Sequence, residues 1–139
     1  MWKIKKLALI LLFGVSCFCY SQNQLKYVKI GNIEGKIDIK DFKLMGGEAK
    51  YMQLLKEFEN NFSQVNNRYN NYYRYYSIID SSPRKLVATL FPKNLVPAES
   101  KRKQEYLNVP SNTKIFKVYY NMKTKEIDGI IETKPGIFQ

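Results

Sequence analysis

A periodic stripe of apolar side chains constrains this fold more strongly than any other feature of the sequence. From Tyr51 to Ile79, apolar residues recur every three or four positions. The members of the stripe are Tyr51, Leu54, Phe58, Phe62, Val65, Tyr69, Tyr72, Tyr76 and Ile79. Their mean spacing of about 3.5 residues matches the repeat of an α-helix and predicts one amphipathic helix of up to about 30 residues.

The stripe leaves two partners open for this helix. The same spacing is found in coiled coils, so the stripe could pair with a second copy of the protein. Packing on the protein's own sheet is the favoured interpretation, because bulky aromatic rings fill the stripe instead of the leucines and isoleucines of dimer seams. Asparagine pairs at 60–61, 66–67 and 70–71 have low helix propensity and could break the helix near its middle.

Segments of alternating polarity on both sides of the stripe predict strands. Near the N-terminus, the segments 25–30 and 36–40 flank the turn residues 31–35 and predict two antiparallel strands. Near the C-terminus, the segments 114–120 and 126–133 predict a hairpin. Together these segments predict an antiparallel sheet of about four strands.

Two short helices are expected between the stripe and the C-terminal hairpin. Ser82 and Pro83 form a typical helix entry, which predicts a short helix over 83–91. A second short helix is predicted over 98–107 and must end before Pro110. The predicted fold class is therefore α+β: a small antiparallel sheet of about four strands, packed by one long amphipathic helix, with two short helices between.

The first 21 residues have the layout of a secretory signal peptide. A lysine-rich start precedes an apolar run, and small residues follow at a plausible cleavage point after Ser21. This predicts a signal peptide over 1–21 and one small domain over 22–139, exported to the periplasm or the exterior. The alternative is a membrane-tethered lipoprotein, lipidated at Cys17.

The missing residue types exclude several chemistries. The chain has no histidine, and both of its cysteines, Cys17 and Cys19, lie inside the predicted signal peptide. A processed, cysteine-free chain would lack thiol nucleophiles, imidazole bases, and zinc or copper sites built on these ligands. The carboxylates are scattered and no phosphate-binding loop is present. We therefore expect no metal, no cofactor and no catalytic residues, and a carboxylate-based hydrolase is the weakest alternative.

A tyrosine-rich cluster is the candidate ligand-binding site. Five tyrosines lie within residues 69–76, around Arg74. On a continuous helix, three of them would belong to the apolar stripe, which leaves Tyr73 and Tyr75 beside Arg74 to stack against sugar rings or bases. Exposed rings at these two positions would support binding, and burial of all five tyrosines would exclude it.

The positive charge of the chain suggests an anionic partner. Lysine and arginine number 23 against 12 acidic residues, and the basic triplet Lys101, Arg102 and Lys103 could contact an anionic surface. Specific phosphate recognition favours arginine, and the chain has only four arginines. No specific nucleic acid is therefore expected.

These features favour an exported, non-catalytic binding or interaction module of the cell envelope. An envelope glycan, an anionic lipid or a protein is the expected partner, recognised through the tyrosine-rich segment or a sheet edge. The alternative is a structural protein that forms homo-oligomers through the stripe.

Overall fold

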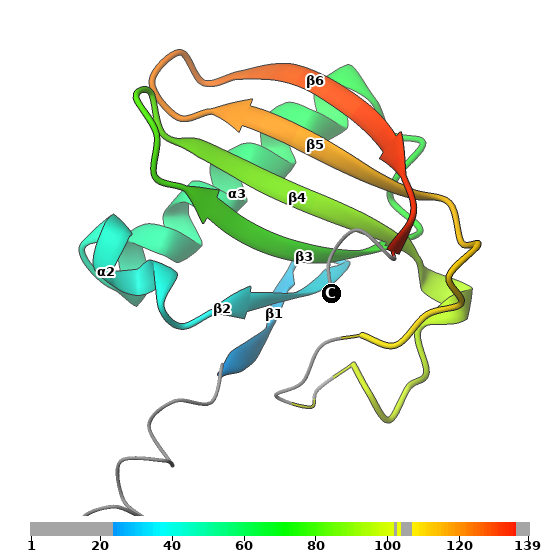
Figure 1. Ribbon diagram of the computed structural model, residues 1–139. Helices are drawn as coiled ribbons and strands as arrows, with labels where there is room; N and C mark the ends of the chain where they lie inside the picture. Colours follow the sequence, from blue (N-terminus) through cyan, green and yellow to red (C-terminus); the bar gives the residue numbers. More distant parts are fainter. Residues whose placement is uncertain (1–23, 102, 104–106, 136–139) are drawn as a thin grey trace, which may run out of the picture.

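Six strands lie side by side in the order in which they occur in the chain (Figure 1). The structure, a computed structural model, describes residues 24–101, 103 and 107–135. Its elements are β1 (Leu25–Ile30), β2 (Ile33–Asp38), α2 (Asp41–Met45), α3 (Glu48–Val65), β3 (Tyr72–Ile79), β4 (Lys85–Pro92), the 3₁₀ turn η1 (Lys93–Leu95), β5 (Ile115–Asn121) and β6 (Glu126–Thr133). All neighbouring strands are antiparallel except β2 and β3, which run parallel.

The predicted fold class is wrong in the number and direction of its strands. The described chain forms a mixed sheet of six strands with two α-helices, of which only α3 is long. The expected four-stranded antiparallel sheet lacked β3 and β4, because the segments that form them were assigned to helices. Both errors have a physical cause in the local sequence.

The long helix ends sooner than its stripe predicts. Helix α3 stops at Val65, and the backbone N–H of Asn66, already extended, donates to the Phe62 carbonyl. The asparagine-rich residues 66–71 connect the helix to β3. Asparagine favours such connections because its side chain competes for backbone hydrogen bonds; the Asn66 side chain accepts one from the N–H of Arg68 at 3.0 Å.

Strand β4 occupies the place of the predicted helix over 83–91. Its residues 86–91 are all buried, because β4 lies in the interior of the sheet with β3 on one side and β5 on the other. A short, mostly apolar run of this kind fits a doubly covered strand as well as a helix. The second predicted short helix is also wrong, since the described residues within 98–107 form turns and bends.

Both terminal hairpins are present, although β2 begins at Ile33 and ends at Asp38, whereas the predicted second strand covered 36–40 after a longer turn. Strands β1 and β2 pair from Leu25 opposite Asp38 to Ile30 opposite Ile33, around a two-residue turn that places Gly31 at a φ of +58°. This value favours glycine because it has no Cβ. Strands β5 and β6 form the predicted C-terminal hairpin, with a bulge where the register shifts beside Tyr119.

Each face of the sheet has its own core. Helix α3 covers one face and buries a large aromatic and aliphatic cluster that includes Phe58, Tyr76 and Tyr120. The segment after β4 covers part of the other face, where Tyr73, Phe91, Val96 and Ile115 form a smaller cluster. The two clusters follow from the alternation of side chains along β3 and β4.

Gly35 is a close-packing position between the two parallel strands. It lies opposite Arg74, and a Cβ at this position would come within 2.7 Å of the Arg74 carbonyl oxygen and 2.9 Å of the Arg74 Cβ. Neither neighbour can move without displacing β3. We expect Gly35→Ala to lower the free energy of unfolding by about 1–3 kcal/mol, measured by urea denaturation.

Gly129 provides the matched control for that substitution. It also lies in a strand, but nothing comes within 4 Å of an added Cβ. Gly129→Ala should therefore leave the stability nearly unchanged. Equal losses for the two variants would show that the close approach of β2 and β3 does not limit the residue at position 35.

Candidate functional site

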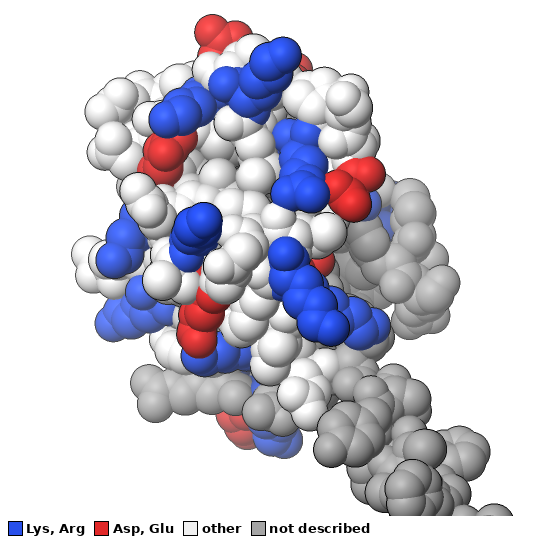
Figure 2. All heavy atoms as spheres, turned by 90° about the vertical axis from the view of Figure 1, so that its left-hand side faces the viewer, with Lys and Arg blue, Asp and Glu red and all other residues white. Residues whose placement is uncertain are grey.

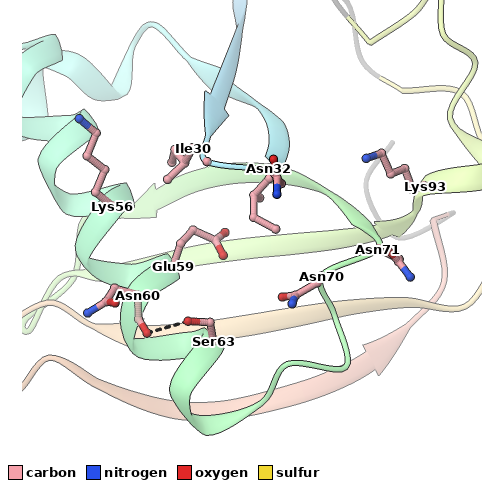
Figure 3. A pocket seen from close by; sticks show the side chains of 11 residues that line it. Ile30, Asn32, Lys56, Glu59, Asn60, Ser63, Asn70, Asn71 and Lys93 are labelled. Atoms are coloured by element: carbon pink, nitrogen blue, oxygen red, sulfur yellow. Dashed lines mark hydrogen bonds between the residues drawn. The ribbon is translucent and has the colours of Figure 1, made fainter.

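A polar pocket opens where three parts of the chain meet (Figure 3). Its volume is about 540 Å³, within the range of small-molecule sites. The turn between β1 and β2 forms one wall, α3 forms a second, and the connection before β3 together with η1 forms the third. The lining residues are Ile30, Gly31, Asn32, Ile33, Lys56, Glu59, Asn60, Ser63, Asn70, Asn71 and Lys93.

Helical spacing explains the wall contributed by α3. Lys56, Glu59, Asn60 and Ser63 lie at positions i, i+3, i+4 and i+7, so they share one stripe of the helix. This polar stripe runs beside the apolar stripe that packs on the sheet. The helix thus uses one face for the core and the adjoining face for the pocket.

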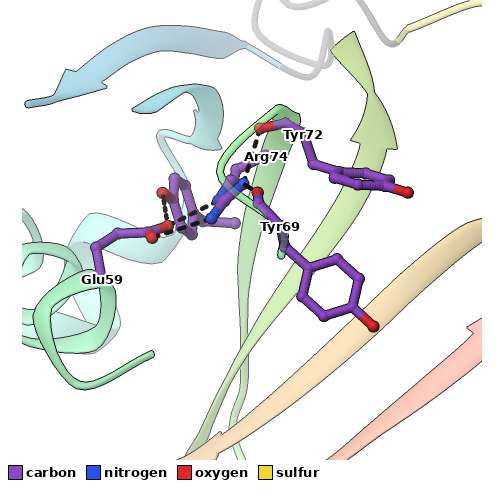
Figure 4. A network of polar contacts seen from close by, with 5 residues as sticks. Glu59, Tyr69, Tyr72 and Arg74 are labelled. Carbon is purple, nitrogen blue, oxygen red and sulfur yellow. Dashed lines mark hydrogen bonds and ion pairs between the residues drawn. The ribbon is translucent and has the colours of Figure 1, made fainter. Parts of the chain in front are cut away.

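A buried ion pair lies at the inner side of the pocket (Figure 4). The Arg74 side chain is only 1 % exposed, and its Nε and Nη2 donate to the two carboxylate oxygens of Glu59 at 2.9 and 3.2 Å. The Tyr76 hydroxyl donates to Glu59 Oε1 at 2.5 Å. Such bidentate pairing and full hydrogen bonding are what make a buried ion pair tolerable.

Arg74 also fixes the chain that forms the third wall. Its Nη1 donates to the carbonyl oxygens of Tyr69 and Tyr72, at 2.5 and 2.8 Å. Figure 4 shows the guanidinium between Glu59 and these two carbonyls. Asn70 and Asn71 lie between the two anchored residues, so the ion pair positions the pocket wall as well as joining β3 to α3.

Two of the tyrosines buried in the core beneath α3, Tyr76 and Tyr51, differ in their hydrogen bonding. We expect Tyr76→Phe to lower the free energy of unfolding by about 1.5–3 kcal/mol, because it removes a hydrogen bond to a buried carboxylate. Within the described residues, the buried Tyr51 hydroxyl has no hydrogen-bond partner. Tyr51→Phe should therefore leave the free energy of unfolding unchanged or raise it. Thermal and urea unfolding of both variants measure the two changes, and a larger loss for Tyr51→Phe than for Tyr76→Phe would contradict this ranking.

Four asparagines line the pocket, and their side-chain amides have no protein partner among the described residues. They are Asn32, Asn60, Asn70 and Asn71. Each amide offers two donors and an acceptor. The Ile30 side chain, which is half buried, adds an aliphatic surface.

Two lysines stand at opposite sides of the pocket in the view of Figure 3. Lys56 is exposed and makes no ion pair with another described residue. Lys93 lies 3.5 Å from a carboxylate oxygen of Glu34. Because Arg74 already balances Glu59, the two lysines give the pocket an excess of positive charge.

The structure separates the tyrosines and the arginine of the predicted binding site. In a strand, Arg74 points to one face of the sheet, and Tyr73 and Tyr75 point to the other. Tyr73 is fully buried and its hydroxyl donates to the Lys101 carbonyl at 2.6 Å, whereas Tyr75 is half buried. Arg74 therefore does not lie beside Tyr73 and Tyr75 on one face, because the segment is a strand and not the helix on which that arrangement depended.

Two residues of the basic triplet, Lys101 and Lys103, lie in the described part of the chain. Lys101 Nζ lies 3.7 Å from Glu34, and Lys103 is exposed. Arg102 and Cys17 lie outside the described residues, as does the predicted cleavage point. Figure 2 shows lysine and arginine side chains spread over one face of the molecule, with acidic side chains beside several of them.

Glu34 connects the N-terminal hairpin to the segment that follows η1. The Tyr27 hydroxyl donates to Glu34 Oε2 at 2.7 Å, and Lys93 and Lys101 lie near Oε1. The hydrogen bond from Tyr27 lowers the pKa of Glu34, partial burial opposes it, and the two lysines lower the pKa further.

This lowered pKa predicts a pH dependence. A carboxyl whose pKa is lower in the folded state stabilises the protein above its ordinary value of 4.5, and this contribution disappears as the pH falls through the lower folded pKa. We expect Glu34→Gln to be less stable than the parent at pH 7, with the difference shrinking below pH 4.5. Urea midpoints measured from pH 7 to pH 3 test this, and a constant difference would oppose it.

The chemistry of the described residues does not indicate a metal centre. No group of three or more histidine, cysteine, aspartate or glutamate side chains lies together in residues 24–101, 103 and 107–135. Both carboxylate oxygens of Glu59 are already engaged by Arg74 and Tyr76.

Neither helix in the described residues combines the length and the apolar character needed to cross a membrane.

Comparisons of the chain with protein-family models, curated proteins and solved structures give no match. The candidate site therefore rests on the residues of this chain. Sequence reasoning missed it because its walls come from separate stretches, each of which is only a few polar residues long. The asparagine pairs near 60 and 70 were the one visible indication.

Proposed function

We propose that the protein is an exported, non-catalytic binding module, and that the polar pocket is its binding site for a small, hydroxyl-rich ligand. Export rests on the predicted signal peptide over 1–21. The observation that supports the site is the set of four asparagines that line the pocket and whose side-chain amides have no partner among the described residues. Amides can both donate to and accept from the hydroxyl groups of a saccharide.

Two further features favour binding over catalysis. Glu59, the one carboxylate that lines the pocket, is held by Arg74 and Tyr76 through both of its oxygens, so it is not poised to exchange a proton with a ligand. The pocket is also supported by regular elements on two sides and by the anchored connection on the third. Such a prearranged site reduces the entropic cost of binding.

Self-association through the apolar stripe gains no support from the arrangement of α3. Its central members Phe58 and Phe62 are buried in the protein's own core, and Val65, at the end of the helix, is 73 % exposed. The stripe is therefore already occupied by the sheet.

The proposed site can be tested by following backbone amide resonances of the purified protein during titration with neutral and acidic trisaccharides. Binding should perturb the resonances of the pocket residues. Asn70→Ala should weaken the affinity about threefold to tenfold, the effect of one neutral hydrogen bond. Asn112→Ala removes an exposed asparagine elsewhere and should have no effect.

Perturbations confined to the other face of the sheet would contradict this site. So would equal effects of the two asparagine substitutions. If no saccharide in the panel perturbs the pocket residues, the proposal that this is a saccharide-binding site fails.

A further inference from the structure

The charge of the pocket narrows the class of ligand, if the pocket is the binding site proposed above. Among its lining residues, the ionisable groups are Lys56, Glu59 and Lys93. Glu59 is neutralised by Arg74 at the inner side of the pocket. What faces an incoming ligand is therefore the positive charge of two lysines and a set of neutral amides.

Lys56 stands at the rim of the pocket, where its long, exposed side chain can swing toward a ligand. It lies one helical turn before Glu59 and Asn60 on the stripe of α3 that lines the pocket. Its side chain is exposed, and no carboxylate in the described part of the chain pairs with it. Binding of an anionic group to Lys56 would therefore break no ion pair between described residues.

Lys93 provides a second, weaker positive contact. Its ammonium is shared with Glu34, from which it is separated by 3.5 Å. Glu34 in turn accepts a hydrogen bond from Tyr27 and lies near Lys101, so its charge is distributed over several partners. The negative charge of Glu34 therefore cancels only part of the positive charge of Lys93 on this side of the pocket.

We infer that the pocket binds an acidic saccharide, whose anionic substituent pairs with Lys56 and whose hydroxyl groups pair with the surrounding asparagine amides. None of the described residues that line the pocket is an arginine, and an ammonium attracts an anion as a point charge. The common chemistry is a sugar ring that carries one anionic substituent, either the carboxylate of a uronic acid or a sulfate. The half-buried Ile30 side chain contacts the apolar face of the ring.

The test compares three trisaccharides with the same rings and linkages: α-1,4-galactotriose, α-1,4-trigalacturonate and galactotriose sulfated at position 6. Affinities are measured by calorimetry and by amide resonance shifts at low and at moderate salt. We expect the two acidic sugars to bind about tenfold more tightly than galactotriose, as charge-assisted hydrogen bonds predict. This preference should decrease at moderate salt.

Matched lysine substitutions separate a specific contact from general attraction. Lys56→Met should abolish most of the preference for the acidic sugars. Lys50→Met removes the same charge from another exposed position of α3 and should retain the preference. If Lys56→Met weakens the affinity for trigalacturonate more than the affinity for the sulfated sugar, a carboxylate is the favoured anionic group. If it weakens both affinities equally, the site recognises either anion. Both results support the inference.

Two outcomes would overturn it. If galactotriose binds in the pocket as tightly as the acidic sugars and Lys56→Met changes neither affinity, the ligand class is wrong while the saccharide site stands. If Lys56→Met and Lys50→Met weaken acidic binding equally, only non-specific attraction remains. The absence of any resonance shift in the pocket with all three sugars would instead refute the proposed function itself.

Discussion

Replacing Arg74 with methionine is expected to lower the free energy of unfolding by about 3–5 kcal/mol, the effect of breaking a buried ion pair by removing one partner. The substitution leaves the buried Glu59 carboxylate without its counter-charge and removes both bonds to the Tyr69 and Tyr72 carbonyls. Urea denaturation monitored by circular dichroism measures the loss.

Two further variants identify the cause of that loss. Arg84→Met breaks an exposed ion pair with Asp80 and should cost less than about 1 kcal/mol. The double variant Glu59→Leu with Arg74→Met removes both buried charges and should recover a large part of the stability. A double variant as unstable as Arg74→Met would mean that the unpaired Glu59 charge is not the source of the loss.

Truncating Phe58 to alanine should cost about 3–5 kcal/mol, as for other buried aromatic residues. Its side chain is fully buried where α3 meets the sheet, stacked on Phe62 with ring centroids 5.5 Å apart and edge-on to Tyr76 and Tyr120. The alanine leaves a cavity that three aromatic rings surround, and rigid rings cannot collapse into it. Thermal and urea unfolding both measure this change.

The control for Phe58 comes from the same sequence stripe. Val65 occupies an equivalent position in the periodic pattern, yet its side chain is 73 % exposed. Val65→Ala should therefore change the free energy of unfolding by less than about 0.5 kcal/mol. A loss comparable with that of Phe58→Ala would indicate that Val65 is buried in solution, as the continuous helix would require.

The comparison of these two residues shows what sequence periodicity could and could not predict. A helix repeats its face every 3.6 residues and a strand every two, so both return a side chain to the same face after four positions. Tyr72 and Tyr76 are four apart, and both face α3 from a strand. The stripe therefore predicted correctly that the two side chains share one face, where Tyr76 is fully buried and Tyr72 half buried, but it assigned them to the wrong element.

The candidate site shows a different limit. Alternation and turn residues were sufficient for the C-terminal hairpin, because its partners are neighbours in the chain. Glu59 and Arg74 carry no local pattern that pairs them, since their contact depends on the crossover from α3 to β3. Asn32 approaches Asn70 only after β2 and β3 have joined. No rule based on nearby residues could have placed these groups together.

The parallel pairing of β2 with β3 makes the pocket a junction between two halves of the sheet. The β1–β2 hairpin and the strands β3–β6 can each form from neighbouring segments, but their union must wait until the intervening chain has closed a long loop. The pocket spans this seam, with the hairpin turn on one side and Asn70, Asn71 and Lys93 on the other. A ligand bound there would contact both halves of the sheet at once. It would therefore stabilise the pairing of β2 with β3, which is the non-local step of folding, along with the native state.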